Sequence, residues 1–96
     1  MMRKNDLKIG EILGALVRDP KYKPKLYQKK IEHTWQEMMG VWINRETRSI
    51  RVKNGILTVR ISSSALREEL HFMREKIREK INGMLGEDYI TDVVVK

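Results

Sequence analysis

The segment IRVKNGILTVRI, residues 50–61, is the most informative stretch of this 96-residue chain. Apolar and polar residues alternate on both sides of Asn54-Gly55, which is the period of a strand with one buried face. Asn-Gly is the preferred pair for a two-residue hairpin turn, because both central positions of that turn need a positive φ. The sequence therefore predicts a β-hairpin whose sheet is covered on one side only.

Two helices are predicted before the hairpin. Apolar residues at helical spacing predict one over 7–17, and it must end before Pro20 because the residue preceding a proline is pushed out of the helical region. The second begins at Pro24, which suits the first helical position, and we interpret Gly40 as its C-terminal cap. Its inner residues are predicted to be Leu26, Ile31, Trp35, Met38 and Met39.

A long helix and a final strand are predicted after the hairpin. The helix begins at a serine cap, Ser63 or Ser64, and closes at Gly86. Residues 89–95 (YITDVVV) are predicted to form the last strand. The apolar stripe of the long helix consists of Leu66, Leu70, Met73, Ile77, Ile81 and Met84.

The predicted order α-α-β-β-α-β defines an α+β domain. The last strand can lie parallel to the second hairpin strand after a helical crossover. We therefore expect a three-stranded mixed sheet with helices packed on one face. Residues 1–96 have the length of one domain.

Positive charge is concentrated in the first part of the chain. Residues 1–60 hold 14 basic and 6 acidic residues, a net charge of +8, whereas residues 61–96 hold 6 basic and 7 acidic residues, a net charge of −1. A positive field over one part of a small domain favours a polyanionic partner: nucleic acid, an acidic protein surface or anionic lipid. A basic surface that only keeps the domain soluble is the alternative.

The sequence lacks the residues that several classes of chemistry require. There is no cysteine and no apolar run long enough for a membrane span or a signal peptide, so we expect a cytoplasmic protein. His33 and Glu37 lie one helical turn apart without a third metal ligand. Ser62, Ser63 and Ser64 lack the glycine elbow of a nucleophile, and no phosphate-binding glycine loop is present. We expect no catalytic residues, no metal, no cofactor and no small-molecule substrate.

The candidate binding residues are basic side chains that can neutralise phosphates without reading sequence. Tyr22 and Tyr27 interleave with some of them and are candidates for base stacking, whereas Trp35 and Trp42 are predicted to be core or hinge residues. A solvated rim with core-packing tyrosines is the alternative. The basic candidates are Arg18, Lys21, Lys23, Lys25, Lys29 and Lys30 around the start of the second helix, and Arg51, Lys53 and Arg60 on the polar face of the hairpin.

One short motif suggests RNA binding. Gly83-Met-Leu-Gly86 matches the G-x-x-G loop with which KH domains clamp a nucleic-acid backbone between two helices. Here it follows a long predicted helix, precedes a strand and contains no basic residue. We interpret it as the end of a helix.

From the second predicted helix onward, the chain resembles the DciA-like family, bacterial proteins that assist loading of the replicative helicase. The resemblance covers residues 24–95 and leaves residues 1–23 as an N-terminal helix and basic loop. It implies a KH-like fold, a role near DNA replication, and contact with DNA and a DnaB-type helicase. The motifs are Trp35-Gln-Glu-Met-Met-Gly40, Thr47, Asn54-Gly55 with the strand that runs to Ser62-Ser63, Glu69-Leu70, Ile81-Asn82 and Leu85-Gly86.

The leading hypothesis is a non-enzymatic nucleic-acid-binding accessory protein of DNA replication that resembles DciA. An RNA-binding KH-like module is the second hypothesis. A protein-interaction adaptor that binds helicase or another acidic surface without nucleic acid is the third.

Overall fold

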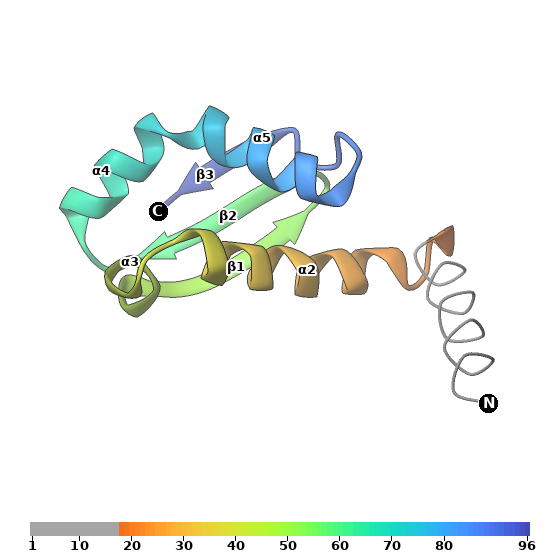
Figure 1. Ribbon diagram of the computed structural model, residues 1–96, viewed down its shortest axis with the longest axis horizontal. Helices are drawn as coiled ribbons and strands as arrows, with labels where there is room; N and C mark the ends of the chain where they lie inside the picture. Colours follow the sequence, from red (N-terminus) through yellow and green to blue (C-terminus); the bar gives the residue numbers. More distant parts are fainter. Residues whose placement is uncertain (1–17) are drawn as a thin grey trace.

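The computed structural model describes residues 18–96, and the helix predicted over 7–17 lies outside them. The helices lie together on one face of a small sheet (Figure 1). The elements in chain order are α2 (Lys23–Met38), α3 (Val41–Glu46), β1 (Thr47–Lys53), β2 (Ile56–Ile61), α4 (Ser64–Phe72), α5 (Arg74–Leu85) and β3 (Asp92–Val95).

The sheet has three strands in the order β1-β2-β3. β1 pairs antiparallel with β2, and β2 pairs parallel with β3, so the sheet is mixed. Asn54 and Gly55 have φ values of 52° and 79°, as a two-residue hairpin turn requires. The structure confirms the α+β class and the mixed three-stranded sheet, and the arrangement is consistent with a KH-like fold.

The core lies between the inner face of the sheet and the helices. Ile31 and Trp35 of α2 are fully buried, and the indole Nε1 of Trp35 donates a hydrogen bond of 3.2 Å to Thr47 Oγ1. Each fully buried large apolar side chain contributes about 1.5–3 kcal/mol. The core consists of Tyr27, Ile31, Trp35, Leu57, Val59, Ile61, Leu66, Leu70, Ile77, Ile81, Ile90 and Val93.

The long helix predicted after the hairpin is two helices. It breaks at Met73, where φ is −94° and ψ is 9°, and the Met73 side chain is 49% exposed. The break is invisible in the pattern because Leu70 and Ile77, on either side of it, keep the seven-residue spacing of one continuous helix. Met84 is exposed as well, since Asn82 occupies an inward position on the last turns of α5.

The prediction for Gly40 is also wrong. α2 ends at Met38, and Gly40 is the N-cap of α3, a short helix that the sequence analysis missed. The side-chain amide of Asn44 donates to the carbonyl oxygens of Gln36 and Met39, at 2.9 and 3.0 Å, and so satisfies the end of α2 without a left-handed glycine. Trp42 lies on α3 and is 61% exposed, so it is not a core residue.

The end of α5 was predicted correctly. Gly86 adopts a left-handed conformation with a φ of 76° and caps the helix. The last strand begins three residues later than predicted, at Asp92. Before it, the buried Asn82 amide donates to the Ile90 carbonyl and accepts from the Ile90 N–H, both at 2.8 Å. Those bonds replace strand pairing at Ile90.

Candidate nucleic-acid interface

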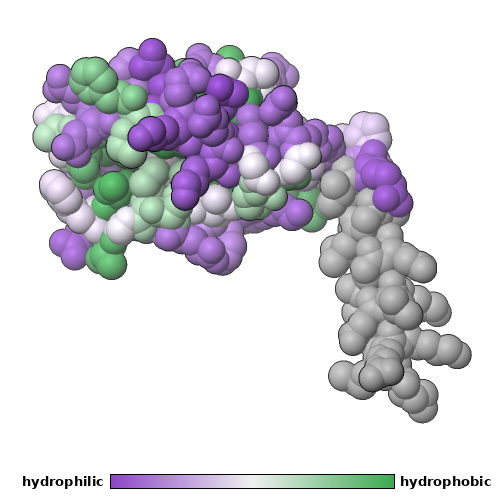
Figure 2. Space-filling view, turned by 45° about the horizontal axis from the view of Figure 1, so that its top comes forward, coloured by the Kyte–Doolittle hydropathy of each residue, from purple (hydrophilic) through white to green (hydrophobic). Residues whose placement is uncertain are grey.

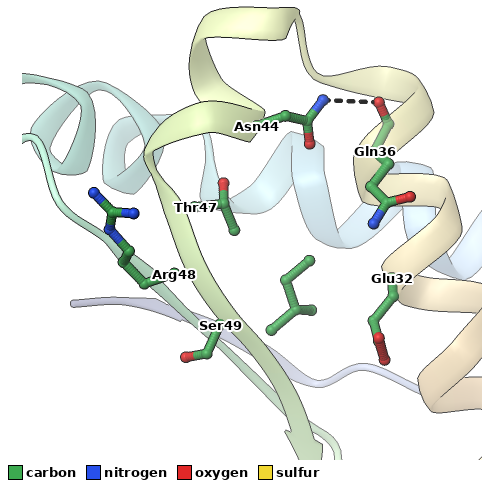
Figure 3. Close-up of a pocket in the computed structure, with 7 residues that line it drawn as sticks. Glu32, Gln36, Asn44, Thr47, Arg48 and Ser49 are labelled. Carbon is green, nitrogen blue, oxygen red and sulfur yellow. Dashed lines mark hydrogen bonds between the residues drawn. The ribbon is translucent and has the colours of Figure 1, made fainter.

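A groove runs between α2 and the edge strand β1, and we name it the α2–β1 groove. It comprises two adjoining hollows of about 580 and 360 Å³ that share Glu32, Ser49 and Ile50. Figure 3 shows the smaller hollow, with Glu32 and Gln36 projecting from α2 and Arg48 and Ser49 from β1. Both hollows are open to solvent.

The larger hollow is lined by cations from both sides. Lys25 and Lys29 lie one helical turn apart on α2, and Arg51 faces them from β1. Glu32 is the one carboxylate among the residues that line it. Three positive side chains against one negative side chain give the hollow the sign that a phosphate backbone requires.

The amide of Gln28 closes the floor of this groove. Its Nε2 donates to the Ile50 carbonyl at 2.7 Å, and its Oε1 accepts from the Val52 N–H at 2.9 Å. β1 is an edge strand, and these two backbone groups point away from β2. Gln28 therefore pairs with β1 as a neighbouring strand would, and it fixes the distance between the two walls of the groove.

The outer face of the sheet continues the positive surface. Arg51 and Lys53 line a hollow of about 260 Å³ on this face. Arg60, which pairs with Ser49 in the register, is the diagonal neighbour of Arg51. Since Arg51 lines both the groove and the outer hollow, it joins the two. We name the continuous set Lys25, Lys29, Arg51, Lys53 and Arg60 the cationic strip.

Two predicted lysines lie on the opposite flank of α2. The Lys23 ammonium forms an ion pair of 3.0 Å with Glu87, so its charge is neutralised locally. The Lys30 ammonium lies 5.9 Å from the centroid of the Tyr27 ring. The structure therefore divides the lysines of α2 between two flanks instead of gathering them on one surface.

Tyr27 is not a stacking residue. Only 3% of it is exposed, and its hydroxyl donates a hydrogen bond to Glu87. That hydrogen bond, together with burial and the Glu87 charge, raises the pKa of Tyr27 to about 12. The signal was present in the sequence, because Tyr27 precedes the core residues Ile31 and Trp35 by one and two helical turns.

The candidates before α2 lie at the surface. Arg18 and Lys21 are exposed, and the Lys21 N–H donates to Asp19 Oδ1 at 2.8 Å. Tyr22 is 40% exposed, with the Lys21 ammonium 5.7 Å from its ring centroid. Tyr22 remains the one predicted stacking residue whose ring is accessible.

Two residues of the site were missed. Gln28 carried no signal, because a polar residue among lysines on a helix is unremarkable in sequence. Arg48 lies where the β1–β2 register shifts between Thr47 and Ser49. That irregularity breaks the two-residue alternation and follows no turn motif, so the strand pattern did not extend to Arg48.

The glycine motif does not occupy the position that a KH loop requires. After the hairpin, the helices α4 and α5 follow one another and meet at Phe72-Met73-Arg74, without glycine. Gly83 lies inside α5 and Gly86 caps it. The prediction that Gly83–Gly86 ends a helix is confirmed, and the α4–α5 junction does not have the glycine loop with which KH domains clamp a backbone.

Residues 18–96 contain no cluster of three or more acidic or histidine side chains able to hold a metal ion. Over the same residues, no helix is both long and apolar enough to cross a membrane.

The fold and the cationic strip define a small KH-like domain with a surface suited to a polyanion. A family sequence profile described as Dna[CI] antecedent, DciA, matches residues 8–95, nearly the whole chain. The protein belongs to the DciA family, a family of helicase accessory proteins in DNA replication. Comparisons with curated proteins and with solved structures returned no significant match.

Proposed function

We propose that this protein is a non-enzymatic accessory factor of the replicative helicase that holds DNA along the cationic strip. Family membership supports the role beside a DnaB-type helicase. The observation that supports the DNA contact is that Arg51 lines two hollows. It thereby joins the α2–β1 groove to the outer face of the sheet. The protein acts in the cytoplasm, where both partners are found.

The cationic strip suits contact with the phosphate backbone of DNA and not the recognition of its bases. Its five cations lie on one helix and two strands, and they span a path along which successive phosphates can be neutralised. Contacts of this kind position a nucleic acid without selecting a sequence. Tyr22, at the start of α2, adds one accessible ring for stacking with an unpaired base.

The test is a titration of labelled single-stranded and double-stranded DNA at increasing salt concentrations. Because binding releases counterions, the logarithm of the affinity falls linearly with the logarithm of the salt concentration. Each phosphate contact adds about 0.7 to the magnitude of this slope for single strands and about 0.9 for duplexes. Four to five contacts therefore predict slopes of about −3 for single strands and about −4 for duplexes. No binding at low salt, or binding without a salt slope, would contradict the phosphate-contact proposal.

The same titration separates DNA from RNA. An RNA of matched sequence tests the alternative of a KH-like RNA-binding module. Because the α4–α5 junction lacks the glycine loop, we expect no preference for RNA. A clear preference for RNA would replace the replication proposal with the RNA-binding one.

The helicase contact is tested with purified components. The full chain is mixed with the DnaB-type helicase of the same bacterium after nuclease treatment, and binding is measured by calorimetry. A complex that survives nuclease treatment supports a direct protein contact. Failure of the helicase to bind would contradict the accessory role, whatever the result with DNA.

A further inference from the structure

A second surface lies between the C-terminal end of α2 and the start of α5, and we name it the methionine cleft. Met38 and Met39 line it from α2, and Met73 and Ile77 line it from the α4–α5 junction and α5. Its volume is about 180 Å³. An apolar cavity of about 150 Å³ holds a benzene molecule, so the cleft has room for one bulky apolar side chain.

The side chains of the cleft suit a protein contact. Methionine is unbranched and polarisable, and it adapts to differently shaped apolar partners. Phe72, next to Met73 at the junction, is 81% exposed, and this is the largest exposed fraction of any large hydrophobic residue in the described part of the chain. In Figure 2 hydrophobic side chains show at the left-hand end of the domain, the end that carries α3 and α4.

The positive charge at the rim of the cleft favours an acidic partner. Lys76 and Lys80 are the remaining residues that line the cleft, and they lie four residues apart on α5. No carboxylate is among the residues that line it. Side chains four residues apart on a helix are neighbours on its surface, so two carboxylates at the same spacing on a partner helix can face the two ammonium groups.

The cleft and the cationic strip are separated by α2 itself. Lys25, Gln28 and Lys29 face β1, whereas Met38 and Met39 face α5. A ligand in the α2–β1 groove therefore leaves the cleft accessible.

We propose that the methionine cleft is the docking site for an acidic amphipathic helix of a protein partner. One apolar anchor of that helix enters between Met38, Met73 and Ile77, and its flanking carboxylates face Lys76 and Lys80. The proposal rests on the proposed function in taking the helicase as the protein that supplies this helix. It adds the surface and the chemistry of the contact.

The first experiment measures helicase affinity for the full chain and two matched variants. Met73→Glu places a carboxylate in the cleft, and Met84→Glu places one near the end of α5, outside the cleft, at a position of similar exposure. We expect Met73→Glu to weaken binding at least about tenfold and Met84→Glu to leave it within about twofold. Equal binding by the two variants would overturn the proposal while leaving the helicase role intact.

The charge reversal Lys76→Glu/Lys80→Glu is a second variant, since both residues are exposed. It should weaken helicase binding at least about tenfold, whereas Lys53→Glu, in the cationic strip, should not. Circular dichroism confirms that each variant is folded. Binding unchanged by the double reversal overturns the acidic character of the partner.

A peptide experiment decides the proposal if the helicase itself does not bind. The probe is a synthetic amphipathic helix with leucine on one face and glutamate on the other, compared with the same peptide carrying lysine in place of glutamate. Nuclear magnetic resonance should show methyl shifts at Met38 and Met73 with the acidic peptide only. Equal response to both peptides, no response to either, or binding to phosphatidylglycerol vesicles in place of the peptide overturns the proposal.

Discussion

The two flanks of α2 differ in what they offer a partner, although they belong to one helix. Towards β1 the helix presents Lys25 and Lys29 with a polar floor made by Gln28. Towards α5 it presents Met38, its last residue, and the C-cap residue Met39. A stripe of buried core residues lies between the two flanks of α2, so both flanks remain at the surface. A single amphipathic helix can therefore separate a charged contact from an apolar one without a second domain.

The largest expected effect comes from reversing three charges of the groove. Lys25→Glu/Lys29→Glu/Arg51→Glu removes three of the proposed phosphate contacts, each worth about 1 kcal/mol at 4 Å in water, and adds repulsion. DNA affinity should fall by more than about 100-fold at low salt, while helicase affinity stays unchanged. Fluorescence anisotropy and calorimetry measure the two. A parallel loss of both affinities would show that the two flanks are not independent.

Removing the floor of the groove should cost stability. Gln28→Ala leaves the Ile50 carbonyl and the Val52 N–H without their side-chain partner, and we expect the free energy of unfolding to fall by about 1–2 kcal/mol. Urea denaturation measures this change. Gln36→Ala, at an exposed position of the same flank, is the control and should change stability by less than about 0.5 kcal/mol. Equal effects would mean that Gln28 contributes no more than an exposed helix residue.

Adjacent lysines test which flank holds DNA. Lys29 lines the α2–β1 groove, whereas Lys30 lies on the Tyr27 side of α2. Lys29→Glu should lower DNA affinity by about tenfold and reduce the salt slope by about one contact. Lys30→Glu makes the same change in net charge, but it should lower the DNA affinity and the salt slope less than half as much. If the two variants behave alike, DNA responds to net charge alone and the groove is not the site.

The smallest expected effect concerns the hydrogen bond between Tyr27 and Glu87. The hydrogen bonds from Tyr27 and Lys23 lower the pKa of Glu87, so its carboxylate stabilises the fold above its ordinary pKa and this stabilisation is lost as the pH falls below that value. The pKa of Tyr27 is raised from 10.0 to about 12, so stability is lost as the pH rises from 10 towards 12.

Glu87→Gln should therefore flatten the dependence of stability on pH at both ends, because it removes the carboxylate and the first cause of the Tyr27 shift. Denaturation midpoints across pH measure the stability, and the nuclear magnetic resonance signal of the Tyr27 ring, which is resolved from those of Tyr22 and Tyr89, reports its ionisation. Glu79→Gln, an exposed carboxylate of α5, is the control. DNA binding should be unaffected, since this contact lies on the flank away from the groove.

The sequence predicted the sheet better than the helices. Asn54-Gly55 and the alternation around it determined the hairpin, its two faces and the positions of Arg51 and Lys53. The break at Met73 was hidden, because the apolar spacing from Leu70 to Ile77 is the same for one helix as for two. The end of α2 was misplaced because its cap is the side chain of Asn44, a contact between two helices that no local motif announces.

The sequence predicted which residues could contribute to the candidate site, but not how they are arranged on the surface. Clustered lysines indicated a positive region, but their division between two flanks depends on how α2 packs between β1 and α5. Lys23 illustrates the limit, because its partner Glu87 is 64 residues away in sequence. The double role of Arg51 likewise follows from the proximity of α2 to the edge of the sheet.

The amide of Gln28 has a consequence for self-association. An edge strand with unpaired backbone groups is a template on which another chain can add a strand, and such additions lead to aggregation. A strand arriving at β1 must first displace Gln28 from Ile50 and Val52. Copies of the domain can therefore lie close together while their β1 edges remain protected from one another.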